Sequence, residues 1–158
     1  MKKVLSILVL ALSLSFVAQA QINPQAIGLR LGGGSVGNLE FSYQKALGGE
    51  NRFEADLGFG GNSKHSRLYL AGIYQWVWNI DGGFNWYAGP GASLGFWSFK
   101  DADDYVNVGI GGQIGIEFDF NTLGTPLLMS IDARPMWDLL GDDAGLGWGA
   151  ALGIRYTF

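Results

Sequence analysis

The last thirteen residues of the chain alternate strictly between two kinds of side chain. One set is apolar and consists of Leu146, Trp148, Ala150, Leu152, Ile154, Tyr156 and Phe158. The residues between them are glycine, alanine, arginine or threonine. Because successive side chains of a β-strand point to opposite faces, this segment is predicted to be a strand with one wholly apolar face and one small or polar face.

The same alternation recurs in seven earlier segments, which are separated by turn residues. These segments are residues 26–33, 38–45, 51–60, 67–79, 84–96, 105–120 and 127–137. Together with the last segment they predict an all-β chain of eight antiparallel, up-and-down strands. An even strand number brings both ends of the chain to one rim, which we expect to face the periplasm. The loops expected on the outer side lie near residues 33–37, 61–66, 97–104 and 138–145.

The volume of the apolar residues indicates which face of the predicted sheet points outward. The chain contains six tryptophans, six tyrosines and ten phenylalanines, many of them on the apolar faces. An eight-stranded barrel has an interior only just wide enough for side chains to fill, so it has no room for this set. The opposite faces are rich in glycine, which suits a narrow lumen. We therefore expect a transmembrane β-barrel with its apolar faces in lipid, and a soluble barrel with an apolar interior is the alternative.

Charged residues within the predicted strands fall on the glycine-rich faces. The eleven expected to form a lumen charge network are Arg30, Glu40, Arg52, Glu54, Asp56, Arg67, Glu117, Asp119, Asp132, Arg134 and Arg155. Five are basic and six are acidic, and buried charges are tolerated only when they are paired and hydrogen-bonded. We expect them to form salt bridges that fill and close the lumen. Lumen charge of a single sign, which would favour a pore, is not seen.

The first twenty residues have the pattern of a secretory signal peptide. Lys2 and Lys3 precede an apolar stretch over residues 4–17, and Ala18-Gln19-Ala20 fits a cleavage site. We therefore divide the chain into a signal peptide, residues 1–20, and a barrel domain, residues 21–158. No later apolar run is long enough for a membrane-spanning helix, so a membrane-spanning chain must cross as a closed barrel. The chain has no cysteine, which excludes a lipid-modified cysteine anchor and disulfides.

Net charge narrows the class of partners. Without Lys2 and Lys3 the chain has eight basic and fourteen acidic side chains, a net charge near −6. Nucleic-acid binding requires a basic surface, so we expect no nucleic-acid partner. No cofactor, metal site or catalytic residue is predicted.

In the order of its features, the chain resembles the small eight-stranded outer-membrane barrels of the OmpA/OmpX-like group. The resemblance rests on the predicted signal peptide, the eight amphipathic strands and the terminal Ile154-Arg155-Tyr156-Thr157-Phe158. It implies a bacterial outer-membrane location, a monomer, and contacts with outer-membrane lipid and lipopolysaccharide. In that group a terminal aromatic residue with alternating apolar residues upstream is read by the barrel-assembly machinery. The matching residues here are Leu152, Ile154, Tyr156 and Phe158.

Two prolines depart from the strand pattern. Pro90 and Pro135 lie inside predicted strands, where the missing N–H removes a ladder hydrogen bond. We expect β-bulges or bends at both positions.

Two loop features raise other functions. His65 is the only histidine and adjoins Ser63, Lys64 and Ser66, so it is the candidate for a lipid A-modifying enzyme, with Asp101 or Asp142 as the orienting acid. An ordinary solvated loop residue is the favoured interpretation. Acidic residues at two loop tips are candidate cation ligands, although their spacing matches no cation-loop signature; they are Asp101, Asp103, Asp104, Asp138, Asp142 and Asp143. The leading hypothesis is a non-enzymatic barrel with a structural or surface-interaction role, and a small-solute pore is the main alternative.

Overall fold

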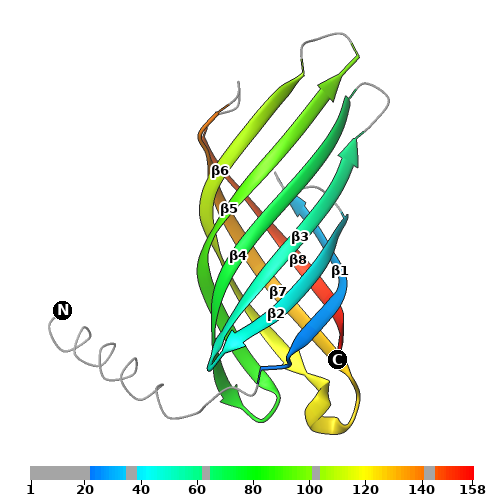
Figure 1. Ribbon diagram of the computed structural model, residues 1–158, viewed down its shortest axis with the longest axis vertical. Coiled ribbons are helices and arrows are strands. Elements are labelled where there is room, and N and C mark those ends of the chain that lie inside the picture. The colour runs from blue at the N-terminus through cyan, green and yellow to red at the C-terminus, as the bar shows by residue number, and fades with distance from the viewer. Residues whose placement is uncertain (1–21, 35–38, 62–64, 101–103, 141–144) are drawn as a thin grey trace, which may run out of the picture.

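The computed structural model describes residues 22–34, 39–61, 65–100, 104–140 and 145–158, and it shows one closed antiparallel sheet (Figure 1). The predicted signal peptide lies outside these residues. Eight strands follow one another in chain order: β1 Gln25–Gly34, β2 Leu39–Gly48, β3 Asn51–Gly61, β4 His65–Asp81, β5 Phe84–Phe99, β6 Tyr105–Asp119, β7 Leu127–Asp138 and β8 Gly145–Thr157. A short 3-10 helix, η2 Phe120–Leu123, links β6 to β7. The predicted all-β, eight-stranded architecture is confirmed.

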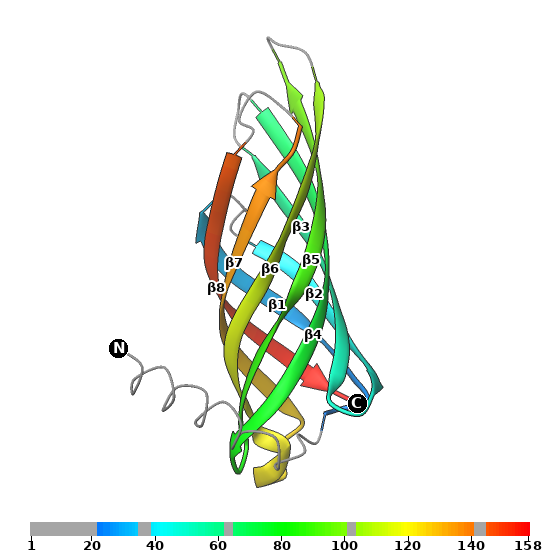
Figure 2. The same cartoon turned by 90° about the vertical axis from the view of Figure 1, so that its left-hand side faces the viewer.

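Pairing between the first and last strands closes the barrel. Ala26 lies opposite Thr157, and Arg30 lies opposite Gly153. β1 therefore begins and β8 ends at the same rim, which we call the terminal end (the lower end in Figures 1 and 2). At this end, tight turns connect β2 to β3 and β4 to β5. Gly49 and Gly82 there have φ angles of 60° and 53°, which glycine adopts without steric cost.

Strand length differs strongly around the barrel. β1 and β2 have 10 residues each, whereas β4 has 17 and β5 has 16. The longer strands rise above the others at the end opposite the terminal end (Figure 1). The sequence segments match the strands closely, but β4 extends to His65 and Asp81 on either side of the predicted 67–79.

The prolines interrupt the ladder without shifting its register, so neither position has a register-shifting bulge, and the bend expected as the alternative stays a prediction. Pairing of β4 with β5 resumes in the same register on both sides of Pro90, and pairing of β6 with β7 does so on both sides of Pro135. Each proline keeps regular pairing with its other neighbour, since Pro90 lies opposite Gly112 and Pro135 lies opposite Trp148. One neighbouring strand thus accommodates the missing N–H, and the inward and outward faces stay in phase.

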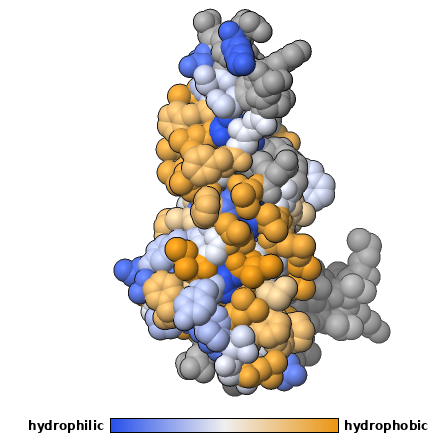
Figure 3. All heavy atoms as spheres, turned by 90° about the vertical axis from the view of Figure 1, so that its right-hand side faces the viewer, coloured by the Kyte–Doolittle hydropathy of each residue, from blue (hydrophilic) through white to orange (hydrophobic). Residues whose placement is uncertain are grey.

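Side-chain direction follows the predicted alternation. On β6, Ile110, Ile114 and Ile116 are each half exposed on the outer surface, whereas Gln113 and Glu117 are buried in the lumen. Figure 3 shows hydrophobic side chains over much of the visible outer surface. Because the large apolar residues point outward and the charged ones inward, the soluble-barrel alternative is excluded. None of the helical segments in the described part of the chain has the length and hydropathy of a membrane span.

Candidate functional site: the polar lumen

The lumen holds one connected hydrogen-bond network that reaches every strand. Its members come from alternate positions of each strand, because every second side chain of a strand points to the same face. One residue from each strand, in order from β1 to β8, traces it: Arg30, Glu40, Glu54, Gln75, Tyr87, Gln113, Arg134 and Arg155. These side chains are almost completely buried.

Glu54 on β3 is the centre of the network. Its two carboxylate oxygens accept hydrogen bonds from Arg134 and Arg155, each at 3.2 Å. Three glutamines from other strands also donate to it, namely Gln44 at 2.5 Å, Gln75 at 3.2 Å and Gln113 at 3.1 Å. The Glu54 side chain has no exposed surface, so these donors replace all of its hydration.

A second group surrounds Arg134 and Arg30 on the side of Glu54 away from the terminal end. Arg134 donates to Glu40 at 3.2 Å and to Asp56, and Glu40 accepts a further bond from Arg30 at 2.7 Å. Arg30 also forms a fork-like contact with Asp132, which is 102 residues away in the sequence. Such two-pronged guanidinium–carboxylate pairs fix both geometry and charge.

A third group lies toward the terminal end. Arg52 binds Glu117 through both terminal nitrogens, at 3.0 and 2.6 Å, and its Nε donates to Gln75 at 2.5 Å. The Arg52 guanidinium also lies over the Tyr87 ring, 4.8 Å from its centroid. Below it, Val77 and Tyr87 form a small apolar layer against which Ile22 packs.

Nine of the eleven predicted charged residues therefore come together, as four arginines and five carboxylates. Asp119 lies apart at the terminal end, where it accepts hydrogen bonds from Asn23 at 2.8 Å and from Asn121 at 2.6 Å. Arg67 lies toward the other end, with its guanidinium 4.8 Å from the Tyr69 ring centroid and 4.6 Å from that of Trp97.

Sequence reasoning missed the neutral members of the network. Gln44, Gln75 and Gln113 link the ionic groups, and Ser42 and Ser130 accept hydrogen bonds from Arg155, each at 2.9 Å. The signal that identifies them is their strand parity, because all five are on the same faces as the charged residues.

Three of the predicted assembly residues lie on the outer face of β8, and Phe158 directly follows its last residue. Leu152, Ile154, Tyr156 and Phe158 are each about half exposed, and the rings of Tyr156 and Phe158 stack with centroids 6.2 Å apart. A row of this kind at the rim has the character of an interfacial aromatic belt.

The loop hypotheses fall largely outside the described residues. Ser63, Lys64, Asp101, Asp103, Asp142 and Asp143 belong to undescribed segments, as does the side chain of His65. His65 itself begins β4, opposite Phe99. Within the described ranges, no group of three or more histidine, aspartate or glutamate side chains is arranged to hold a metal ion.

Comparisons with known proteins find this architecture in solved structures. No model of a known protein family matches the chain, and no curated protein sequence does. The N-terminal β-barrel domain of Pseudomonas aeruginosa OprF superimposes with a TM-score of 0.62 at 14% identity, covering 85% of this chain and 96% of that one. Neisserial surface protein A superimposes with a TM-score of 0.56 at 16% identity, covering 85% and 94%.

A third similar structure is the outer-membrane enzyme PagL. Its TM-score is 0.51 at 10% identity, and the match covers 84% of this chain and 99% of PagL. The fold is thus compatible with both enzymes and other barrel proteins. The chain has the fold of the small eight-stranded outer-membrane β-barrels, and its apolar outer surface is the one that such a barrel presents to lipid.

Proposed function

We propose that the protein is an integral outer-membrane barrel with a closed, charge-paired lumen, a structural or surface-interaction role and no catalytic activity. The observation that carries this proposal is the single network joining all eight strands across the lumen. Opposite charges alternate through its centre, where Arg134 alone binds three carboxylates. An ion crossing the barrel has to break several buried, charge-assisted bonds at once, which opposes conduction.

Planar-bilayer recording tests the closed lumen. We expect the purified protein to give no stable single-channel steps. A double variant, Arg52→Ala with Glu117→Ala, removes one buried ion pair without leaving an unpaired charge. It is the matched control for the effect of a lumen ion pair on conductance. Large, stable steps from the unmodified protein would establish the small-pore alternative instead.

The proposed orientation places the terminal end in the periplasm, with the opposite end of the barrel facing outward. Outer-membrane phospholipid and lipopolysaccharide then cover the apolar belt, and the protein is a monomer. The C-terminal residues Leu152, Ile154, Tyr156 and Phe158 are the proposed signal for the barrel-assembly machinery, supported by their outward row on β8.

Heat-modifiable gel mobility tests both the barrel and its assembly signal. Folded barrels resist detergent unfolding, so unboiled protein should migrate differently from boiled protein. We expect Phe158→Ala to lower the folded fraction in cells, whereas Phe158→Tyr should retain it because an aromatic ring remains at the terminus. Equal folded fractions for both variants would remove the proposed role of Phe158.

The enzyme hypothesis has a direct test of its own, because PagL shows that the fold also occurs in an enzyme. Mass spectra of lipid A from cells with and without the protein report the number of acyl chains. We expect identical spectra. A changed acyl count that disappears in His65→Ala would overturn the non-enzymatic proposal.

A further inference from the structure

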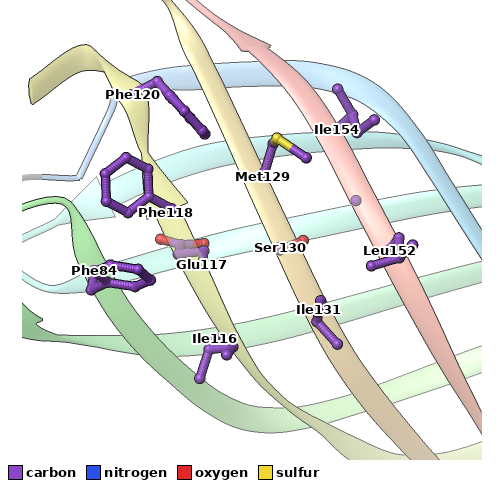
Figure 4. Close-up of a pocket in the computed structure, with 11 residues that line it drawn as sticks. Phe84, Ile116, Glu117, Phe118, Phe120, Met129, Ser130, Ile131, Leu152 and Ile154 are labelled. Carbon is purple, nitrogen blue, oxygen red and sulfur yellow. The ribbon is translucent and has the colours of Figure 1, made fainter. Parts of the chain in front are cut away.

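An apolar groove of about 500 Å³ crosses the outer surface of β5, β6, β7 and β8 near the terminal end. Figure 4 shows apolar side chains around it, contributed by Phe84, Phe118, Phe120, Met129, Ile131 and Ile154. Its volume lies within the range of pockets that hold small organic ligands, about 300–1,000 Å³. No lysine, arginine or histidine is among its lining residues.

The strand register explains the shape of the groove. One ridge is a cross-strand row that runs through Phe84, Phe118, Met129 and Ile154. The second ridge, two residues further along each strand, runs through Ile116, Ile131 and Leu152. Between the ridges the residues point into the lumen, so Glu117, Ser130 and Gly153 contribute only the floor. The spacing of strands makes such a furrow roughly 14 Å long across four strands.

The ridges are taller than the next row on the same surface. The next row away from the terminal end is Ala88, Ile114, Ala133 and Ala150, which is mostly alanine. A comparable groove on the opposite side of the barrel, lined by Ile27, Phe41, Leu57 and Leu70, has only about 240 Å³. Of these two grooves, the one over β5, β6, β7 and β8 is about twice as large.

We propose that this groove holds one acyl chain of a zwitterionic phospholipid as a persistent ligand. The proposal rests on the membrane placement proposed above, because the groove is continuous with the lipid-facing belt and lies in the half next to the periplasm. The groove extends from the rim residues Phe84 and Phe120 into the apolar belt, so an acyl chain lies along it while the headgroup stays at the rim. The absence of cationic side chains from its lining removes the attraction that a lipopolysaccharide phosphate or an anionic phospholipid requires.

Native mass spectrometry of the detergent-purified full chain tests this assignment, with phosphatidylethanolamine and phosphatidylglycerol as separate probes. We expect one bound phosphatidylethanolamine per barrel and weaker retention of phosphatidylglycerol. Ile131→Trp places a larger ring over the groove and should raise the apparent Kd about tenfold, equivalent to about 1.4 kcal/mol. The matched control is Leu57→Trp in the smaller groove, which should leave retention unchanged.

Photo-crosslinking locates the bound chain independently. Vesicles of phosphatidylethanolamine with a diazirine in one acyl chain should label the strand segments around Phe118, Met129 and Ile154 more than those around Leu57 and Leu70. Uniform labelling, equal loss of binding in both tryptophan variants, or a protein dimer that hides the groove would overturn the proposal. These outcomes are independent of conductance, so a failure here is distinguishable from a failure of the closed-lumen proposal.

Discussion

The two faces of the barrel wall use the same strands in opposite solvents. On the inner face, Arg134 and Arg155 both bind Glu54, and none of the three has exposed side-chain surface. On the outer face, Ile131 is 56% exposed and Trp148 is 66% exposed. A soluble protein would reverse this arrangement, because water would favour the charges outside and the apolar groups inside.

The two faces therefore place different requirements on their side chains. Inner residues need specific partners, since a buried charge without one is expensive. Outer residues need only to be apolar, since lipid contacts any hydrocarbon side chain. The effect of a substitution on stability should therefore depend on the lost partner at the inner face, and on depth in the membrane at the outer face.

The largest effect is expected at the centre of the inner network. Glu54→Ala leaves Arg134 and Arg155 buried without their shared carboxylate, and removing one partner of a buried pair costs about 3–5 kcal/mol. Equilibrium urea unfolding in lipid vesicles measures the free energy of unfolding. Glu50→Ala, at the turn between β2 and β3, is the control and should change it by less than about 0.5 kcal/mol. Equal effects at the two positions would contradict the network.

A charge on the outer face should follow depth instead of partners. Ile114→Arg, in the middle of β6, should lower the free energy of unfolding in vesicles by about 2–4 kcal/mol. Val106→Arg, near the end of the same strand, should cost at most about 1 kcal/mol. A difference in the opposite direction would show that the bilayer is not centred on the apolar belt.

Inward-facing glycines differ in how much space the barrel leaves beside the backbone. A Cβ atom at Gly89 would overlap the Tyr74 carbonyl oxygen, whereas one at Gly60 would meet nothing within 4 Å. We expect Gly89→Ala to destabilise the barrel by about 1–3 kcal/mol, as overpacking does. Gly60→Ala should be close to neutral in the same unfolding measurement.

A smaller loss than at the centre of the network is expected at Arg67, toward the other end of the lumen. Its guanidinium stacks between Tyr69 and Trp97, and such contacts are worth about 0.5–1 kcal/mol at partly exposed sites. Arg67→Ala should therefore cost much less than Arg134→Ala in urea unfolding. Comparable losses would place Arg67 within the ionic core.

Most of the fold follows from local alternation, which is why sequence alone predicts all eight strands and the direction of nearly every side chain. Strand parity depends only on a period of two, so it survives even at Pro90 and Pro135, where the ladder is interrupted. Of the predicted bulges or bends, a register-shifting bulge is not needed, because each proline loses pairing with only one neighbour.

Specific partners within the lumen are not predictable in the same way. The contact between Arg30 and Asp132 joins β1 to β7 across the barrel, and it depends on the tilt and stagger of all the strands between them. The same geometry places Asp119 at the terminal end, where it binds Asn23 and Asn121, although its parity matches that of the network members. The glutamines are not predicted, because the lumen network is predicted from charged residues and glutamine side chains are neutral.

Arg155 on β8 forms hydrogen bonds that depend on the closed barrel. Its guanidinium reaches Ser42 on β2, Glu54 on β3 and Ser130 on β7, so it satisfies its hydrogen bonds only when the two ends of the sheet have met. In a barrel whose first and last strands have not paired, the Arg155 guanidinium lacks its partners on β2 and β3. Arg155 therefore ties the hydrogen bonding of β8 to the positions of β2 and β3, which lie more than 100 residues earlier in the sequence.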